Sequence, residues 1–540
     1  MTTVGSWFIS LAAAYTILLI AIGRFAHRKA SGGGGYFVGG RTFNALFVAV
    51  CVTGLFSGSS FIAILELAYL KGVSAVWYGI AETTQVLLIA AVLLAPFRER
   101  LLVTVSGLIG DHFGEQARAL GGAITAFAFP MWSVATALAF ASALHVFTGL
   151  SLLLSVAVTA TLLLIYLQFG GMWSVGYTQL FNVVAIYVML GVGLTAVFID
   201  PGIAGLRHLA LARPELFAPA TVGVQTIVAW FGTFILNVIL AQATFQMALS
   251  CRSLEEGKRG LYWAAGLGLP LIGGAVVIGL AAAYAVPGGR LGLIAVPQYL
   301  MHVLPAPFVA LFFLGFWACA LGWGAPCQFS GATSLGRDVG SALTPGRDEA
   351  TYVRYTRWSL VLLTVLMVIF ASLRSEQSAW WNVLAWVTRN SATFAPVVAA
   401  LFWPLATRRA VLVSMAVGTL TGLGWYDLSH WSLTLFFLHT HPVWPGMIAN
   451  IVALAAITLV ERRGTYTLHL TGRGAAALGA AALAALSIAL FTAPLYATGL
   501  VGLAVFIVVV ALFVAAIDAT RTQPAPASTA GAIQEVEYAG

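Results

Sequence analysis

Residues 44–72 read NALFVAVCVTGLFSGSSFIAILELAYLKG, and this stretch decides the class of fold. It is apolar over more than the roughly 20 residues that a helix needs to cross a bilayer, but Gly54 and the SGSS cluster at 57–60 interrupt its middle. Glycine and serine lower the cost of unwinding, and an unwound turn within a membrane frees N–H and carbonyl groups for a ligand. The stretch therefore predicts a membrane-spanning helix that is broken near its centre. The alternative is that these small residues only allow close packing between helices.

A second stretch, TIVAWFGTFILNVILAQATFQMALSCRS at 226–253, carries a similar interruption. Its polar and small residues are Gly232, Thr233, Asn237, Gln242 and Gln246. It lies five apolar crossings after the first stretch, so the two helices run in opposite directions through the membrane. This arrangement predicts an inverted repeat of five plus five helices around a site halfway through the lipid.

The rest of the chain is equally apolar. Of its 540 residues, 60% are hydrophobic and 8% are charged, whereas a soluble domain carries about 25% charged residues. The apolar stretches predict an all-α membrane protein with about 13–15 transmembrane helices. Basic residues that stay in cytoplasmic loops account for the net charge of +8, so we expect no nucleic-acid partner. The four cysteines show no spacing typical of a metal site or a disulfide framework, and we expect no metal centre.

The charges of the loops predict an orientation. The first apolar run is followed by Arg24, Arg28 and Lys29 rather than by a cleavage site, which indicates a retained helix. If the N-terminus lies outside, most Lys and Arg residues fall in loops on the inside. We therefore expect a multi-pass protein of the cell inner membrane with its N-terminus outside and its C-terminus in the cytoplasm. The tail 519–540, rich in Ala, Thr and Pro, is predicted to be disordered there.

Four motifs, in this order along the chain, resemble the sodium/solute symporter family, a group that includes bacterial carriers of proline, pantothenate and sugars. They are Gly39-Gly40-Arg41 followed by the Ser57-Gly58 helix, GGMWSVGYTQ at 170–179, the segment from Gln246 to Arg259, and the run from Phe394 through Pro404 to Gly418. The resemblance covers roughly residues 5–460. It implies a LeuT-like fold, in which two inverted repeats give alternating access to a central solute site.

The expected organisation follows from this resemblance. Residues 1–43 form an extra N-terminal helix and a cytoplasmic loop, and residues 44–406 form the transporter core. Within the core, repeat one covers about 44–199 and repeat two about 222–406. Residues 407–518 add flanking C-terminal transmembrane helices before the tail.

The resemblance also implies a place for one sodium ion, the possible coupling ion, where the first core helix meets the eighth. Backbone carbonyls near Thr53 and Phe56 would point at the ion, and the family's pair of hydroxyl residues falls on Gly322 and Trp323. Neither of these supplies a side-chain hydroxyl, although sodium needs several oxygen ligands. A shifted alignment would bring Ser330 or Thr333 there instead. At Gln179, many family members carry an acidic residue.

Polar and aromatic residues beside the two expected helix breaks are the predicted solute ligands. They are Ser57, Gly58, Ser59, Gln179, Trp230, Asn237 and Gln242. Ionisable groups within a membrane span are functional candidates because burying them is costly. Glu66, Glu82 and Arg389 are such groups, and either carboxylate could carry a proton if sodium is not used. The competing interpretation is an ion pair with Arg389 or a wetted position at the interface.

These observations favour a secondary transporter of a small organic solute, working by alternating access and coupled to sodium. The alternatives are a proton-coupled or uncoupled carrier, and a membrane sensor that works with a separate signalling partner. An enzyme would gather His, Asp or Cys side chains at one membrane face, and the sequence shows no such cluster, so neither an enzyme nor a bound cofactor is expected. No pattern in the chain indicates its oligomeric state.

Overall fold

The computed structural model describes residues 2–27, 41–99, 104–168, 171–289, 291–375, 378–432 and 434–520, without the side chains of Ser57, Ser59 and residues 171–174. The secondary structure of the described residues is helical, with a single isolated bridge between Phe43 and Cys251 and no strand. The α-helices are α1 (Thr3–His27), α3 (Ala45–Lys71), α4 (Val76–Leu88), α5 (Leu94–Glu99), α6 (Val105–Phe113), α7 (Glu115–Thr148), α8 (Leu152–Leu167), α9 (Gly171–Ile199), α10 (Gly202–Ala212), α11 (Val224–Leu236), α12 (Gln242–Leu249), α13 (Leu254–Ala285), α14 (Gly292–Val303), α15 (Ala306–Cys319), α16 (Ala325–Thr333), α17 (Gly340–Leu343), α18 (Glu349–Leu373), α19 (Ser378–Phe402), α20 (Arg408–Leu428), α21 (Val443–Glu461), α22 (Gly472–Leu490), α23 (Thr492–Ala497) and α24 (Val501–Ala519). Short 3-10 and π segments join them: η2 (Gly72–Ala75), η3 (Ile89–Leu93), η4 (Pro214–Phe217), η5 (Asn237–Ile239), η6 (Ala320–Gly324), η7 (Ser334–Val339) and η8 (Phe437–His439).

Many of these helices are long and apolar enough to cross a membrane. In the described part of the chain there are 11 such helical stretches, or up to 12 with the bent pair α11 and α12. One of them, Ala45–Glu99, contains both α3 and the α4–α5 helix, which are separated at Gly72. The shorter α8 and the more polar α19 are additional to these. The prediction of an all-α, multi-pass membrane protein is confirmed.

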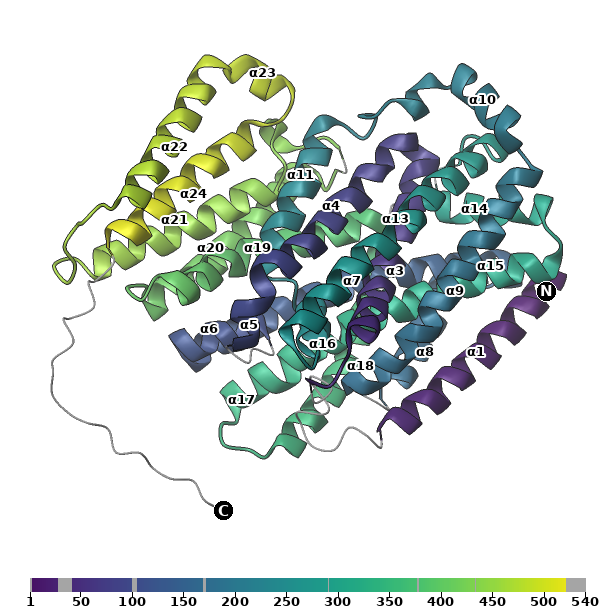
Figure 1. Cartoon of the computed structure of the whole chain (residues 1–540), viewed down its shortest axis with the longest axis horizontal. Coiled ribbons are helices and arrows are strands. Elements are labelled where there is room, and N and C mark those ends of the chain that lie inside the picture. The colour runs from purple at the N-terminus through teal and green to yellow at the C-terminus, as the bar shows by residue number, and fades with distance from the viewer. Residues whose placement is uncertain are drawn as a thin grey trace.

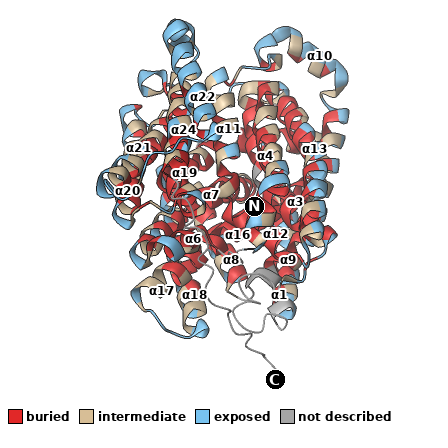
Figure 2. Ribbon diagram, turned by 60° about the vertical axis from the view of Figure 1, so that its left-hand side comes forward, coloured by how far each residue is buried: buried red, intermediate tan, exposed pale blue. Residues whose placement is uncertain are grey.

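The flanking helices lie at two opposite edges of the molecule. In Figure 1, α1 forms one edge, and α20, α21, α22 and α24 form a layer at the other. The helix α1 packs against α9 and α15, while α24 packs between α21 and α22. Figure 2 shows that buried residues gather in the central helices and that α10 and α22 are largely exposed. The core therefore lies between these two edges.

The first core helix, α3, does not unwind. It begins after Asn44, whose side chain accepts a hydrogen bond from the Phe47 N–H (2.9 Å), and it continues without a break to Lys71. It ends at Gly72, whose φ of +68° suits glycine. The prediction of a break near 57–60 is wrong because the backbone groups of this stretch remain paired within the helix.

Close packing explains two of the small residues in α3. A Cβ atom at Gly58 would lie 2.9 Å from the carbonyl oxygen of Cys319, and one at Gly54 would lie 2.4 Å from Oε1 of Gln179. A larger side chain at either position would push α3 away from η6 or from α9. The packing alternative is therefore the one that the structure supports here.

The second stretch does break, as predicted. The helix α11 ends at Leu236, tightens into η5 and then restarts at Gln242 as α12, with a bend of 45° between the two parts. The helix formed by α15, η6, α16, η7 and α17 carries a further irregularity, because η6 and η7 are π segments. Such π segments often occur at functional sites. The irregular backbone thus lies in α11–α12 and in η6–η7 rather than in α3.

Candidate functional site

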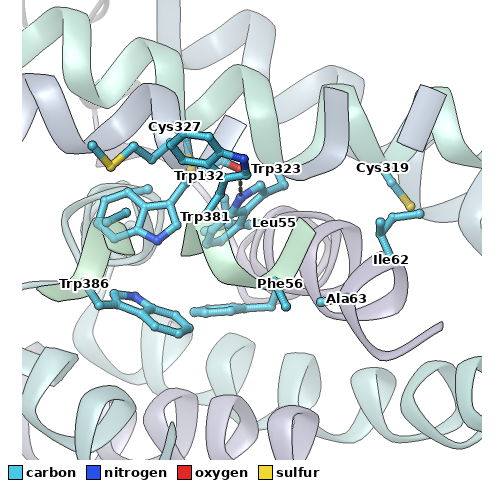
Figure 3. Close-up of a cluster of buried hydrophobic side chains, with 14 of the residues drawn as sticks. Leu55, Phe56, Ile62, Ala63, Trp132, Cys319, Trp323, Cys327, Trp381 and Trp386 are labelled. Carbon is cyan, nitrogen blue, oxygen red and sulfur yellow. Dashed lines mark hydrogen bonds between the residues drawn. The ribbon is translucent and has the colours of Figure 1, made fainter. Parts of the chain in front are cut away.

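A cavity lies where the break between α11 and α12 faces α3, α4, α7, α16 and α19. Its volume is about 30 Å³, enough for only a few water molecules, so its walls have to move apart to admit a solute. Figure 3 shows Phe56, Trp132, Trp323 and Trp386 gathered around this region. The complete lining is Phe56, Gln85, Phe129, Trp132, Phe234, Asn237, Ala241, Gln242, Ala243, Thr244, Trp323, Cys327, Trp386 and Arg389.

Two of the predicted solute ligands, Asn237 and Gln242, line this cavity from the helix break. The side chain of Gln242 links three helical segments. Its Nε2 donates to the carbonyl oxygen of Ser330 (3.1 Å) and to Oγ of Ser334 (3.0 Å), and its Oε1 accepts from the N–H of Val105 (3.2 Å). The same side chain therefore borders the cavity and ties α12 to α16, η7 and α6.

An aromatic layer closes one end of the cavity. The rings of Phe234 and Trp386, both in the lining, have centroids 4.4 Å apart, and Tyr78 packs against both of them. Beyond Tyr78 lies Trp230, with its ring centroid 5.4 Å away. Trp230 lines a separate hollow with Lys71 and Tyr426. The predicted ligand Trp230 is thus separated from the cavity by this layer.

The other predicted solute ligands lie elsewhere. Gly58 lies at the contact between α3 and η6, and the side chains of Ser57 and Ser59 are outside the described part of the structure. Gln179 lies on α9 and faces η6 instead of the cavity: its Nε2 donates to the carbonyl oxygen of Gly322 (2.7 Å). Its Oε1 accepts from Nδ2 of Asn182 (3.2 Å).

The four predicted ion ligands lie on α3 and on η6, which pack against each other. Gly322 and Trp323 belong to η6, and a Cβ at Gly322 would lie 2.6 Å from the carbonyl oxygen of Gly54, so the two helices are in contact there. Trp323 donates through Nε1 to the carbonyl oxygen of Trp132 (2.9 Å) and lines the cavity. The suggested substitutes are also engaged, since Oγ of Ser330 donates to Gln246 (2.8 Å) and Oγ1 of Thr333 to its own helix.

A second, smaller cavity of about 20 Å³ holds a group of oxygen atoms. Thr53, Phe56, Ser60 and Glu82 line it from α3 and α4, and α13 closes it. Among the described residues, Oγ1 of Thr53, Oγ of Ser60 and Oε1 of Glu82 are buried without a hydrogen-bond partner. Phe56 lines both this cavity and the larger one, so its ring forms a shared wall between them.

The expected ion pair of Glu66 or Glu82 with Arg389 does not form. Oε2 of Glu66 accepts from the N–H (2.7 Å) and from Oγ (2.6 Å) of Ser378, the first residue of α19. Neither Glu82 nor Arg389 takes part in any of the ion pairs between described residues. That part of the prediction is wrong because Glu66 caps a helix and Glu82 faces the smaller cavity.

The model of the sodium:solute symporter family matches residues 36–418, which is most of the chain. This chain belongs to the sodium:solute symporter family. The match includes α3, the broken pair α11 and α12, and the residues that line the cavity. Together with the fold, it makes the chain a cation-coupled secondary transporter of a small solute and not an enzyme.

Known members and neighbours agree with this assignment. The chain is 24% identical to a sodium/proline symporter of Staphylococcus aureus (strain Newman) over 84% of this chain and 92% of that protein. Among solved structures, a Na+-coupled sialic acid symporter in a substrate-bound, outward-open state matches with a TM-score of 0.68 and 16% identity, over 84% of this chain and 98% of that one. A nucleobase-cation-symport-1 family transporter, in a closed conformation with bromovinylhydantoin bound, matches with a TM-score of 0.51 and 14% identity, over 79% and 94% of the two chains. The prediction of a LeuT-like transporter is confirmed.

Several residues of the symporter's cavity were not singled out in the sequence. Gln85, Trp132, Phe234 and Trp386 come from four different helices, and each is an ordinary polar or aromatic residue in an apolar run. Arg389 was a functional candidate as an ionisable group within a span, but the sequence indicated no role for it beyond pairing with an acid. The unusual feature was the arginine itself within a span, a signal that favours function.

We predict that replacing Gln179 by Leu lowers the free energy of unfolding by about 1–3 kcal/mol, because the buried carbonyl oxygen of Gly322 and Nδ2 of Asn182 lose a partner. Thermal unfolding of the purified protein measures this loss. The matched control is Gln225→Leu, which removes an exposed hydrogen bond to His439 and is expected to change stability by no more than about 0.5 kcal/mol. Equal stability of Gln179→Leu and the wild type would show that this amide does not hold α9 against η6.

Proposed function

We propose that this symporter moves a small organic solute into the cell by alternating access around the larger cavity. The observation that carries the proposal is the composition of the cavity wall. Helices α3, α4 and α7 come from the proposed repeat of residues 44–199, and α11, α12, α16 and α19 from the proposed repeat of residues 222–406. A solute held between two such units is exposed to either side when they rock against each other.

Each end of the cavity has a set of contacts that opening would have to break. One end has the aromatic layer of Tyr78, Phe234 and Trp386. At the other end, Gln242 bonds to α6, α16 and η7, and Oγ of Ser106 donates to Asp338 (2.6 Å). We assign the aromatic layer to the outer side, because the loop charges favour an N-terminus outside. In that orientation α3 ends at the outer side, and Tyr78 lies near the start of the next helix, α4.

We further propose that Glu82 binds the coupling cation, with sodium as the ion that the family implies and a proton as the alternative. A carboxylate and two hydroxyl oxygens without partners are suitable ligands for a small hard cation. The contact between α3 and η6 is less suitable, since the Gln179 amide already donates to the Gly322 carbonyl there. Phe56 offers a physical link, because a cation beside Glu82 would fix a ring that also borders the solute.

Uptake into proteoliposomes tests this function. We expect a labelled solute from a panel of amino acids, carboxylates and sugars to accumulate against its gradient when a sodium gradient is imposed. A proton gradient alone, imposed in sodium-free buffer, tests the alternative ion. If no solute accumulates under either gradient, the proposed function is wrong.

A further inference from the structure

The larger cavity contains a positive charge without an acidic neighbour. Arg389 lies near the middle of α19 and is only 2% exposed. Its Nη2 donates to Oδ1 of Asn237, and its guanidinium lies over the ring of Trp132, 4.5 Å from the centroid. None of the ion pairs between described residues includes it. Its charge is therefore partly stabilised by an amide and an aromatic ring but is not neutralised.

Burying the charge of Arg389 in this way is energetically costly unless a further partner compensates it. An arginine within a membrane span is expensive, and it is retained where it pairs with a counter-charge or serves a ligand. A cation–π contact compensates only part of the desolvation of a buried charge. Because Arg389 lines the cavity, the cavity is where a counter-charge for its guanidinium would bind.

The hydrogen-bonding groups of the cavity also favour an anion. Three buried donors in its lining have no partner among the described residues: Nε of Arg389, Nε2 of Gln85 and Nε1 of Trp132. One buried acceptor in the lining, Oε1 of Gln85, also has no partner among the described residues. The free donors thus outnumber the free acceptors, and a ligand rich in acceptor oxygens would satisfy them. A carboxylate fits best, because its two oxygens match the fork of a guanidinium.

The remaining residues of the cavity wall indicate the chemical character of the rest of the ligand. Phe56, Phe234, Trp323 and Trp386 present aromatic surface, and these walls close on a space of only about 30 Å³, so a ligand that fits after they open is a small molecule. We propose that Arg389 binds the carboxylate of the transported solute and that the substrate of this symporter is a small organic acid with an apolar body. This inference rests on the proposed function, which places the solute in this cavity.

Ligand-induced thermal stabilisation of the full-length protein in lipid nanodiscs tests the inference. The probes are the sodium salts of acetate, pyruvate, L-lactate and benzoate, each paired with its uncharged amide at the same sodium concentration. We expect at least one acid to stabilise the protein, and its amide to bind about 30-fold more weakly or worse, because the buried charge is then left without a partner.

The Arg389→Gln variant is expected to bind the same acid about 30-fold more weakly or worse and to lose the preference for acid over amide. Arg389→Lys, which keeps the charge without the fork, should retain part of that preference. The matched control is Arg374→Gln, since Arg374 also lies 4.5 Å over a tryptophan, Trp380, but does not line the cavity. This control should bind the acid as the wild type does.

Three results would overturn the inference: no acid of the panel binds, the amides bind as well as the acids, or Arg389→Gln keeps wild-type affinity. A loss of folding in Arg389→Gln would appear as a lower melting temperature without ligand. In that case Arg389→Lys tests the inference, through its preference for acid over amide. Failure of this inference is distinguishable from failure of the proposed function. In the first case, proteoliposomes still accumulate a neutral solute under a cation gradient; in the second, they accumulate nothing.

Discussion

Replacing Glu82 by Gln is expected to abolish the accumulation of solute against its gradient while leaving downhill exchange intact. The carboxylate of Glu82 is 3% exposed and shares its small cavity with Thr53 and Ser60, whose hydroxyl oxygens also lack partners among the described residues. An amide of the same shape cannot supply the negative charge that holds a cation or carries a proton.

The size of the effect follows from linkage. If the cation and the solute stabilise each other's binding, the coupling is typically about 1–3 kcal/mol, so the cation should raise solute affinity in the wild type by roughly 5–150-fold. In Glu82→Gln the cation should leave solute affinity unchanged. Solute binding measured with and without sodium, at constant ionic strength, and again across pH in sodium-free buffer, gives this ratio.

Glu66→Gln is the matched control for this experiment. Glu66 is also a buried carboxylate in the same pair of adjacent helices, but its Oε2 is bonded to the start of α19 at Ser378. The substitution is expected to weaken that contact and to keep cation-driven accumulation. If Glu82→Gln accumulates solute like the wild type, or if Glu66→Gln loses coupling instead, the assignment of Glu82 is wrong.

Replacing Asn450 by Leu is expected to cause the largest loss of stability among single substitutions in the flanking helices. Pro396 lies inside α19, and because it has no N–H, the carbonyl oxygen of Ala392 lacks its normal donor in the helix. Nδ2 of Asn450, on α21, donates to that oxygen (3.1 Å) and to the carbonyl oxygen of Ser414 on α20 (2.9 Å). Its Oδ1 accepts from the N–H of Ala395 (2.9 Å).

Leucine at position 450 removes all of these bonds and leaves a buried carbonyl without a partner, a loss of about 1–3 kcal/mol. Thermal unfolding in detergent measures it, with Thr419→Val as the control, because the Thr419 hydroxyl bonds only to its own helix at Met415. We expect solute uptake per folded molecule to fall as well, since Asn450 supports the helix that carries Arg389. A melting temperature equal to that of the control would mean that the flanking helices do not brace α19.

The sequence predicted the fold well because the relevant signal is simple. Long apolar stretches must form helices in lipid, where backbone groups find no water, and ordered motifs supplied the family. It predicted the break between α11 and α12 but also a break in α3 that does not exist. The two stretches look alike in composition, and the difference lies in their neighbours: Cys319 and Gln179 pack against the glycines of α3, whereas Arg389 bonds to Asn237 at the break in α11–α12.

The site could be predicted only in part for the same reason. Asn237 and Gln242 lie in the broken helix and were found there, while Trp230 lies in the same stretch but faces another hollow. Gln85, Trp132 and Arg389 come from three separate helices and meet only in the folded chain. That Arg389 lacks an acidic partner is a property of its surroundings, and no sequence pattern carries it.

The central claim is that the cavity at the helix break holds the solute and opens to each side of the membrane in turn. Native Cys327 tests it directly, because it lines the cavity and is 1% exposed, while the other three cysteines are buried outside it. A membrane-impermeant methanethiosulfonate reagent is added to one side or the other of oriented vesicles, and modification at each cysteine is followed by mass spectrometry. We predict that Cys327 is modified from both sides and that the solute which the vesicles accumulate slows the reaction. Modification from only one side or from neither, or a rate that the solute does not change, would contradict the account.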